Sequence, residues 1–138
     1  MKISKILMVD DDPSIRRIAQ IGLKGVGKFE VVLCASGAEA LELVASEKPD
    51  LILLDVMMPG MDGPATLSKL RQLNLLERIP VIFMTAKVQK QEVEGYLLLG
   101  ACGVISKPFD PMTLSAQIQD IASGFVLHST SSEVACTM

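Results

Sequence analysis

Histidine, cysteine and aromatic residues are scarce in this sequence, which narrows the chemistry that it can support. Its 138 residues include one histidine, three cysteines, one tyrosine and no tryptophan. His128 lies in a polar C-terminal stretch, which disfavours a catalytic or metal-binding role. Because Cys34, Cys102 and Cys136 show neither CxxC nor metal-ligand spacing, we expect reduced thiols, two of them as small core residues.

An excess of positive charge and a long apolar run are also missing. The net charge is −3 and the sequence pI is near 5.1, which argues against direct binding to nucleic acid or to an anionic membrane. No run approaches the roughly 18 apolar residues of a membrane span. The N-terminus reaches Asp10 too soon for a secretory signal peptide, so we expect a cytoplasmic protein.

What the sequence does contain is a regular alternation of short apolar runs with segments of helical period. With 49% hydrophobic residues, the chain can form one domain around a single core. The alternation indicates a parallel sheet with helices on both faces. The expected strands are residues 5–9, 30–34, 50–55, 80–85 and 103–106, and the expected helices are residues 13–26, 36–46, 64–73, 88–99 and 110–123.

The clearest boundary signals lie at the first helix and near the C-terminus. Asp12 is a natural N-cap with Pro13 at the first helical position, and an apolar stripe continues to Val26. Periodicity is lost from Gly124 onward. We therefore expect a domain over residues 1–123 and a short flexible tail over residues 124–138.

Polar side chains follow four of the five expected strands. They are Asp10 and Asp11 after the first strand, Asp55 at the end of the third, Thr85 at the end of the fourth and Lys107 after the fifth. The carboxyl ends of parallel strands meet at one edge, where α/β proteins bind ligands. Three adjacent carboxylates repel one another unless a cation offsets their charge. Oxygen donors alone favour a hard ion, with Mg²⁺ first and Mn²⁺ as an alternative.

These residue types match phosphoryl transfer. A carboxylate beside a divalent cation can attack a phosphoryl group and form an aspartyl phosphate, a role that we assign to Asp55. Lys107 can supply a fixed ammonium and Thr85 a hydroxyl donor to the transferred oxygens. Each residue alone could be an ordinary turn, strand-end or surface residue. Their joint occurrence at successive strand ends favours the functional interpretation.

Four segments resemble the receiver domains of bacterial two-component response regulators in their order and spacing: ILMVDDDPSIRR, LILLDVMMPGMDG, VIFMTA and GVISKPFDP. The resemblance covers about residues 4–123. It implies a flavodoxin-like (βα)5 three-layer sandwich with a parallel sheet in the order 2-1-3-4-5. It also implies a stand-alone, chemotaxis-regulator-like receiver in a phosphorelay, which is phosphorylated by a histidine kinase or a histidine phosphotransfer protein.

Matched position by position, the resemblance makes Asp55 the phosphoacceptor, Thr85 the switch hydroxyl and Lys107 the phosphate partner. The Mg²⁺ ligands that it implies are Asp10, Asp11, Asp55 and the backbone carbonyl of Met57. It also implies a cis peptide bond between Lys107 and Pro108.

One position departs from the family pattern, and one helix carries an apolar surface. Family members often have Tyr or Phe three residues before the lysine, where this sequence has Val104. An aliphatic side chain lacks the two separated rotamers of a ring, which leaves loop movement around Thr85 as the switch. Tyr96, Leu98 and Leu99 lie in a helical stretch, residues 96–99, that is apolar all round. That face is a candidate surface for a downstream protein or a homodimer, although exposed leucines are also common without a partner.

Two other interpretations stay open at this point. Asp10 and Asp12 match the DxD pattern of haloacid-dehalogenase-like phosphatases, which leaves Asp55 without a role. A flavodoxin-like electron carrier shares the fold, but the acidic triplet would repel the flavin phosphate. We expect a phosphoacceptor rather than an enzyme, limited to self-phosphorylation from small phosphodonors and autodephosphorylation.

Overall fold

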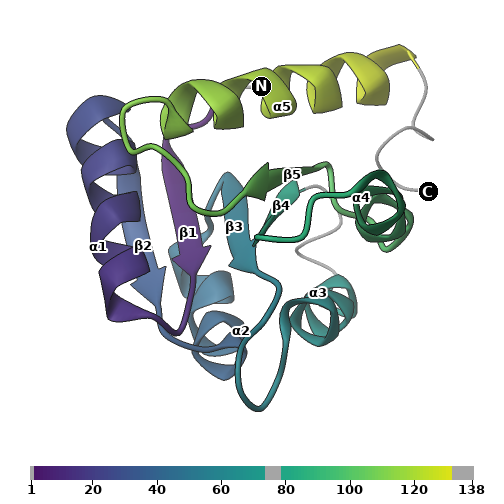
Figure 1. The fold of residues 1–138 in the computed structure, drawn as a ribbon, viewed down its shortest axis with the longest axis horizontal. Helices are drawn as coiled ribbons and strands as arrows, with labels where there is room; N and C mark the ends of the chain where they lie inside the picture. Colours follow the sequence, from purple (N-terminus) through teal and green to yellow (C-terminus); the bar gives the residue numbers. More distant parts are fainter. Residues whose placement is uncertain (1, 74–78, 132–138) are drawn as a thin grey trace.

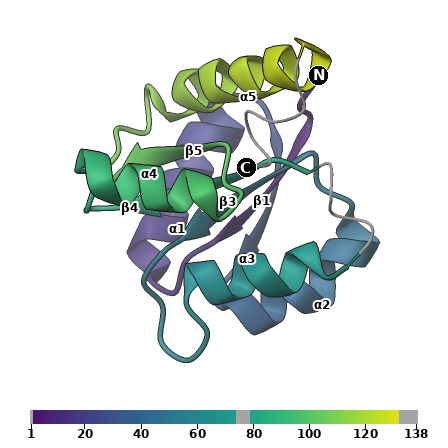
Figure 2. The ribbon, with the colours of Figure 1, turned by 90° about the vertical axis from the view of Figure 1, so that its right-hand side faces the viewer.

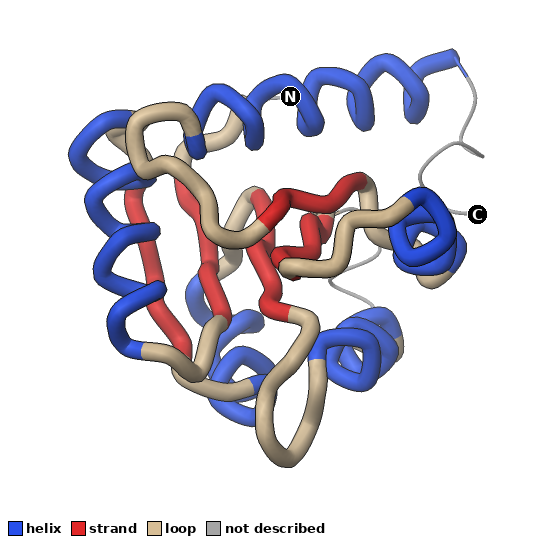
Figure 3. Tube along the Cα trace, in the orientation of Figure 1, coloured by secondary structure: helices blue, strands red, loops and turns tan. Residues whose placement is uncertain are grey.

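Five parallel strands form one sheet in the order β2-β1-β3-β4-β5 (Figures 1 and 3). The computed structural model describes residues 2–73 and 79–131, with side chains for all of these except residues 125–131. The strands are β1 (Lys5–Val9), β2 (Glu30–Cys34), β3 (Leu51–Asp55), β4 (Val81–Thr85) and β5 (Gly103–Ser106). Every residue of β3 and β4 is buried, which explains their continuous apolar runs. The predicted fold class and strand order are confirmed.

Helices cover both faces of the sheet, as Figure 2 shows in side view. One face carries α1 (Pro13–Gln20), the π-helix η1 (Ile21–Val26) and α5 (Leu114–Ser131); the other carries α2 (Gly37–Glu47), α3 (Gly63–Arg71) and α4 (Lys90–Leu98). Alternate strand residues face opposite sides, so Leu7 and Phe83 belong to the core under α2 and α3. Ile6 and Met84 belong to the core under α1 and α5.

Side-chain caps set the start of three helices. Asp12, Ser36 and Asp62 each accept a hydrogen bond from a backbone amide two or three residues further on, at 2.8, 3.1 and 2.9 Å. These bonds satisfy amides that have no partner inside the helix. The predicted caps at Asp12 and Ser36 are confirmed. An aspartate at the end of a strand, such as Asp55, can also cap the helix that follows. Here Asp62 caps α3, so Asp55 does not have that role.

The helix that follows β1 differs from the prediction in its second half. After Gln20 the backbone widens into η1, where the Gly27 amide donates to the Gly22 carbonyl at 3.0 Å. The wider turn shifts the buried stripe, so that Leu23 is buried and Val26 is 38% exposed. Placing Val26 on the buried stripe was wrong, because the 3.6-residue period does not hold across a π-helix.

The last helix begins later and ends later than predicted. The Asp110 carboxylate accepts the Met112 amide at 2.8 Å in a turn that precedes α5, and the helix then continues past Gly124 to Ser131. Once a helix has formed, each further residue adds a backbone hydrogen bond, so the helix can continue through a segment without apolar periodicity. Residues 132–138, with Cys136, lie outside the described residues. Over the two described ranges, no helix is both long enough and apolar enough to cross a bilayer.

Candidate functional site

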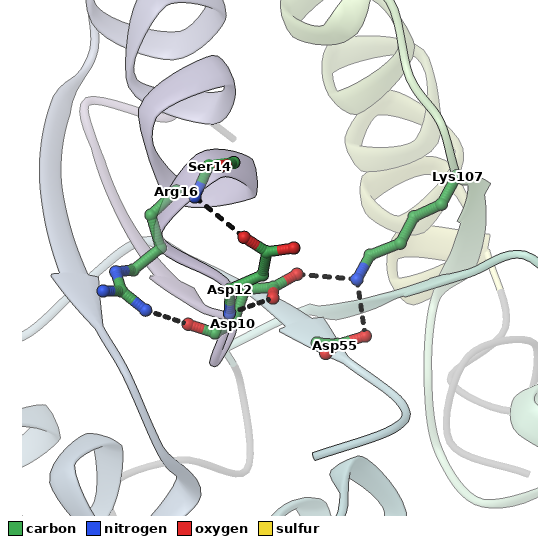
Figure 4. Close-up of polar contacts among 6 residues, drawn as sticks. All are labelled: Asp10, Asp12, Ser14, Arg16, Asp55 and Lys107. Atoms are coloured by element: carbon green, nitrogen blue, oxygen red, sulfur yellow. Dashed lines mark hydrogen bonds and ion pairs between the residues drawn. The ribbon is translucent and has the colours of Figure 1, made fainter.

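The carboxyl ends of the strands bring the predicted acidic residues to one edge of the sheet (Figure 4). Asp10 follows β1 and is fully buried, Asp55 ends β3 and is 3% exposed, and Asp11 is exposed. One carboxylate oxygen from each of the three lies within 4.8 Å of the others. Such a cluster offers only oxygen donors, the ligands that Mg²⁺ prefers.

Lys107 joins the two buried carboxylates. Its Nζ donates to Asp10 Oδ2 at 2.7 Å and to Asp55 Oδ1 at 2.8 Å, contacts that Figure 4 draws as dashed lines. Its backbone amide donates to the Thr85 carbonyl at 2.9 Å, which ties the lysine to the end of β4. The Lys107-Pro108 peptide bond is cis, as predicted.

Burial and charge act together on these groups. Burial raises the pKa of Asp55, the Lys107 hydrogen bond opposes this, the Asp10 charge adds to it, and the pKa is raised overall. Burial alone would lower the pKa of Lys107, but its hydrogen bonds and ion pairs with both aspartates prevail and raise it. Lys107 therefore remains an ammonium and offsets one of the three carboxylates. Two negative charges are left, which is the charge that a divalent cation balances.

Asp10 is held at each of its polar atoms. Its amide donates to the Cys34 carbonyl at 3.0 Å, and its Oδ1 accepts the Asp12 amide at 2.9 Å. Its carbonyl accepts Arg16 Nη1 at 2.7 Å, and Oδ2 accepts Lys107. Sequence reasoning missed Arg16, because a bond from a side chain to a backbone carbonyl leaves no spacing pattern. Its place one turn after the acidic residues was the only signal.

Thr85 and Met57 are joined to Lys107 and Asp55 through backbone groups. Thr85 is 3% exposed, and its Oγ1 accepts the Lys87 amide at 3.0 Å. The Met57 amide hydrogen-bonds to Asp55, whereas the Met57 side chain is 67% exposed. No described contact tests the Met57 carbonyl as a metal ligand, so that role stays a prediction. Val104 is partly buried against the core under α2 and α3.

The apolar residues of α4 divide between the core and the surface. The Tyr96 ring packs on Phe83 with ring centroids 5.2 Å apart, so Tyr96 is partly buried. Leu98 and Leu99 are 68% and 53% exposed. Of the three residues proposed for an interaction surface, the two leucines therefore supply the exposed part.

Comparison with known proteins places this geometry in a family. Residues 6–119 match the family described as response regulator receiver domain. The chain is 38% identical over 130 residues to the alkaline phosphatase synthesis transcriptional regulatory protein PhoP of Bacillus subtilis, covering 94% of this chain and 53% of that protein. It is 38% identical to the DNA-binding response regulator MtrA of Mycolicibacterium smegmatis, covering 83% and 49%. The chain thus spans about half the length of these relatives.

The fold of this chain matches solved structures over nearly the whole length of those structures. The chemotaxis protein CheY4 of Vibrio cholerae superposes with a TM-score of 0.80 at 32% identity, covering 87% of this chain and 99% of that one. A response regulator structure from Chloroflexus aurantiacus gives a TM-score of 0.79 at 32% identity, covering 88% and 99%.

Proposed function

Because the chain belongs to the response regulator receiver domains of two-component signalling, which are phosphoacceptors rather than enzymes, we propose that it accepts its phosphoryl group on Asp55. The donor is a histidine kinase or a histidine phosphotransfer protein. The observation that carries this proposal is the double hydrogen bond of Lys107 to the buried Asp10 and Asp55, beside the third carboxylate of Asp11.

Asp55, Lys107 and Thr85 each have a different role in the phosphoryl transfer. A carboxylate oxygen of Asp55 forms a bond to phosphorus while the bond from phosphorus to the donor nitrogen breaks, and its electron pair leaves with the donor. The Lys107 ammonium neutralises charge on the transferred oxygens, and the Thr85 hydroxyl turns from the Lys87 amide to donate to one of them. Mg²⁺, held by Asp10, Asp11, Asp55 and the Met57 carbonyl, would supply further positive charge to those oxygens when bound.

The same chemistry can use a small phosphodonor, which gives the direct test. We expect one phosphoryl group on the wild type after incubation with acetyl phosphate and Mg²⁺, and none on Asp55→Asn or in EDTA. The carboxamide of asparagine is a poor nucleophile and a weaker cation ligand. Intact-mass spectrometry measures the addition, and peptide mapping of the phosphorylated protein locates it.

Asp12→Asn is the matched control. Asp12 lies in the same acidic turn, but its carboxylate caps α1 by accepting the Ser14 amide at 2.8 Å, a role that asparagine can keep. We expect this variant to be phosphorylated like the wild type. Phosphorylation that persists in Asp55→Asn would contradict the proposal.

The phosphatase interpretation is not favoured. Its second acid, Asp12, is used as a helix cap, and the comparisons match the receiver family instead. A catalytic turnover of phosphomonoesters that is lost in Asp12→Asn but kept in Asp55→Asn would be needed to restore it.

We propose further that the exposed end of α4 contacts a downstream protein or a second copy of the chain after phosphorylation. Leu98 and Leu99 support this, because they expose apolar area on a helix in which no residue is fully buried. We expect Leu98→Glu together with Leu99→Glu to abolish self-association of the phosphorylated protein in sedimentation velocity, or its binding to an isolated downstream partner. Ile21→Glu, at a 52% exposed residue of η1, is the control. If the double variant changed neither property, the surface would have to be sought elsewhere.

A further inference from the structure

Arg16 contacts the backbone of the acidic turn rather than its carboxylates. Its Nη1 donates to the Asp10 carbonyl at 2.7 Å, a short distance that is typical of a charged donor (Figure 4). In the part of the chain that the structure describes, no ion pair joins Arg16 to an acidic side chain. The guanidinium therefore acts on the peptide group that links Asp10 to Asp11.

That peptide group has a particular importance for Asp11. The side chain of Asp10 is fixed by its own bonds to Asp12 and Lys107. The Asp11 carboxylate is exposed, and among the described residues no hydrogen bond reaches it. Among the described contacts, its direction therefore depends on the backbone, and Arg16 bonds the carbonyl of the Asp10–Asp11 peptide.

We infer that Arg16 is a positioning residue, which orients the Asp10–Asp11 peptide so that the Asp11 carboxylate faces the cation site. This inference rests on the proposed function, because it concerns the site that phosphoryl transfer would use. Without the guanidinium, the peptide can rotate, and Asp11 leaves the 4.8 Å cluster that it forms with Asp10 and Asp55. Groups that orient metal ligands in this way commonly change metal affinity by about 10- to 100-fold when they are removed.

A positioning role and a simple charge effect predict opposite results. Arg16 is a cation bonded to the backbone of the acidic turn, so removing its charge alone would strengthen Mg²⁺ binding. Loss of positioning would weaken it. Arg17 provides the matched control, since it lies next in the chain and is exposed, and no described hydrogen bond or ion pair involves its side chain.

The experiment is calorimetric titration of Mg²⁺ into the wild type, Arg16→Met and Arg17→Met, with melting in EDTA as a measure of folding. Methionine keeps an unbranched stem but cannot donate a hydrogen bond. We expect Arg16→Met to bind Mg²⁺ about tenfold more weakly. Arg17→Met should bind it as the wild type does or slightly more tightly. Arg16→Lys, which retains a charged donor, should recover part of the loss.

The possible results distinguish a failure of the Arg16 inference from a failure of the proposed function. If Arg16→Met is folded and binds Mg²⁺ as tightly as the wild type or more tightly, the inference is wrong and the proposed function stands. If the wild type itself does not bind Mg²⁺, the proposed function fails and the inference fails with it. Should Arg16→Met not fold, Arg16→Gln replaces it under the same criteria. Failure of both variants to fold would assign Arg16 to the fold and overturn the positioning role.

Discussion

At Asp55, the pKa of one carboxylate is subject to opposing effects from its surroundings. Burial and the Asp10 charge favour the protonated acid, whereas Lys107 favours the carboxylate. The overall rise in its pKa makes the ionised group more basic, which suits a nucleophile. The residue types and their order in the sequence were sufficient to select Asp55, Lys107 and the acidic pair. The spacing of residues in the sequence does not show which carboxylate oxygens accept the Lys107 hydrogen bonds, because that depends on the atomic positions in the folded chain.

A second residue, Cys34, shows burial without opposing charge. Its thiol is fully buried at the end of β2, and burial raises its pKa to about 12. At pH 8 only about one molecule in 10⁴ would carry the reactive thiolate, compared with about a quarter for an ordinary cysteine. We therefore expect iodoacetamide to leave Cys34 unmodified in the folded protein and to modify it fully in guanidinium chloride, as measured by peptide mapping. Rapid labelling of Cys34 in the folded protein would contradict this.

At the scale of elements, the helix after β1 shows where local prediction works and where it stops. Asp12 and Pro13 predict its start correctly, because a cap involves only residues that are close in sequence. No local pattern predicted the π-helix that follows, and this helix packs against a loop that is distant in the sequence. At Gly22, a Cβ would lie 2.6 Å from the Pro111 carbonyl oxygen.

Substitution of two glycines in η1 tests this packing. We expect Gly22→Ala to lower the free energy of unfolding by about 1–3 kcal/mol, because the added methyl group would displace the backbone at Pro111. At Gly25, an added Cβ would have no atom within 4 Å, so Gly25→Ala should leave stability unchanged or raise it by up to about 1 kcal/mol. Urea unfolding compares the two variants. Equal effects would show that the approach of Pro111 does not constrain the helix.

For the whole molecule, the acidic edge couples cation binding to stability. Asp10, Asp11 and Asp55 repel one another, and Lys107 offsets only part of that charge. A cation that binds only the folded chain raises the free energy of unfolding by about 2.7 kcal/mol at 100 times its dissociation constant. We expect the melting temperature to rise with Mg²⁺ and to fall again in EDTA.

Asp11→Asn separates repulsion from binding in the same measurement. The variant removes one repelling charge, so in EDTA it should melt at the wild-type temperature or above. It should also lose most of the increase with Mg²⁺, because a ligand is missing. An increase equal to that of the wild type would exclude Asp11 from the cation site.

The sequence by itself determined the strands, the helix caps at Asp12 and Ser36 and the set of residues at the strand ends. Apolar runs, helical period and capping act between neighbours in the chain, so the sequence displays them directly. Only the tertiary structure decided which groups meet. Lys107 and Asp10 lie 97 positions apart yet bond at 2.7 Å, and Arg16 holds a backbone carbonyl that any residue would supply. Such contacts arise when the sheet brings strand ends together, because their geometry belongs to the packed chain and not to any local pattern.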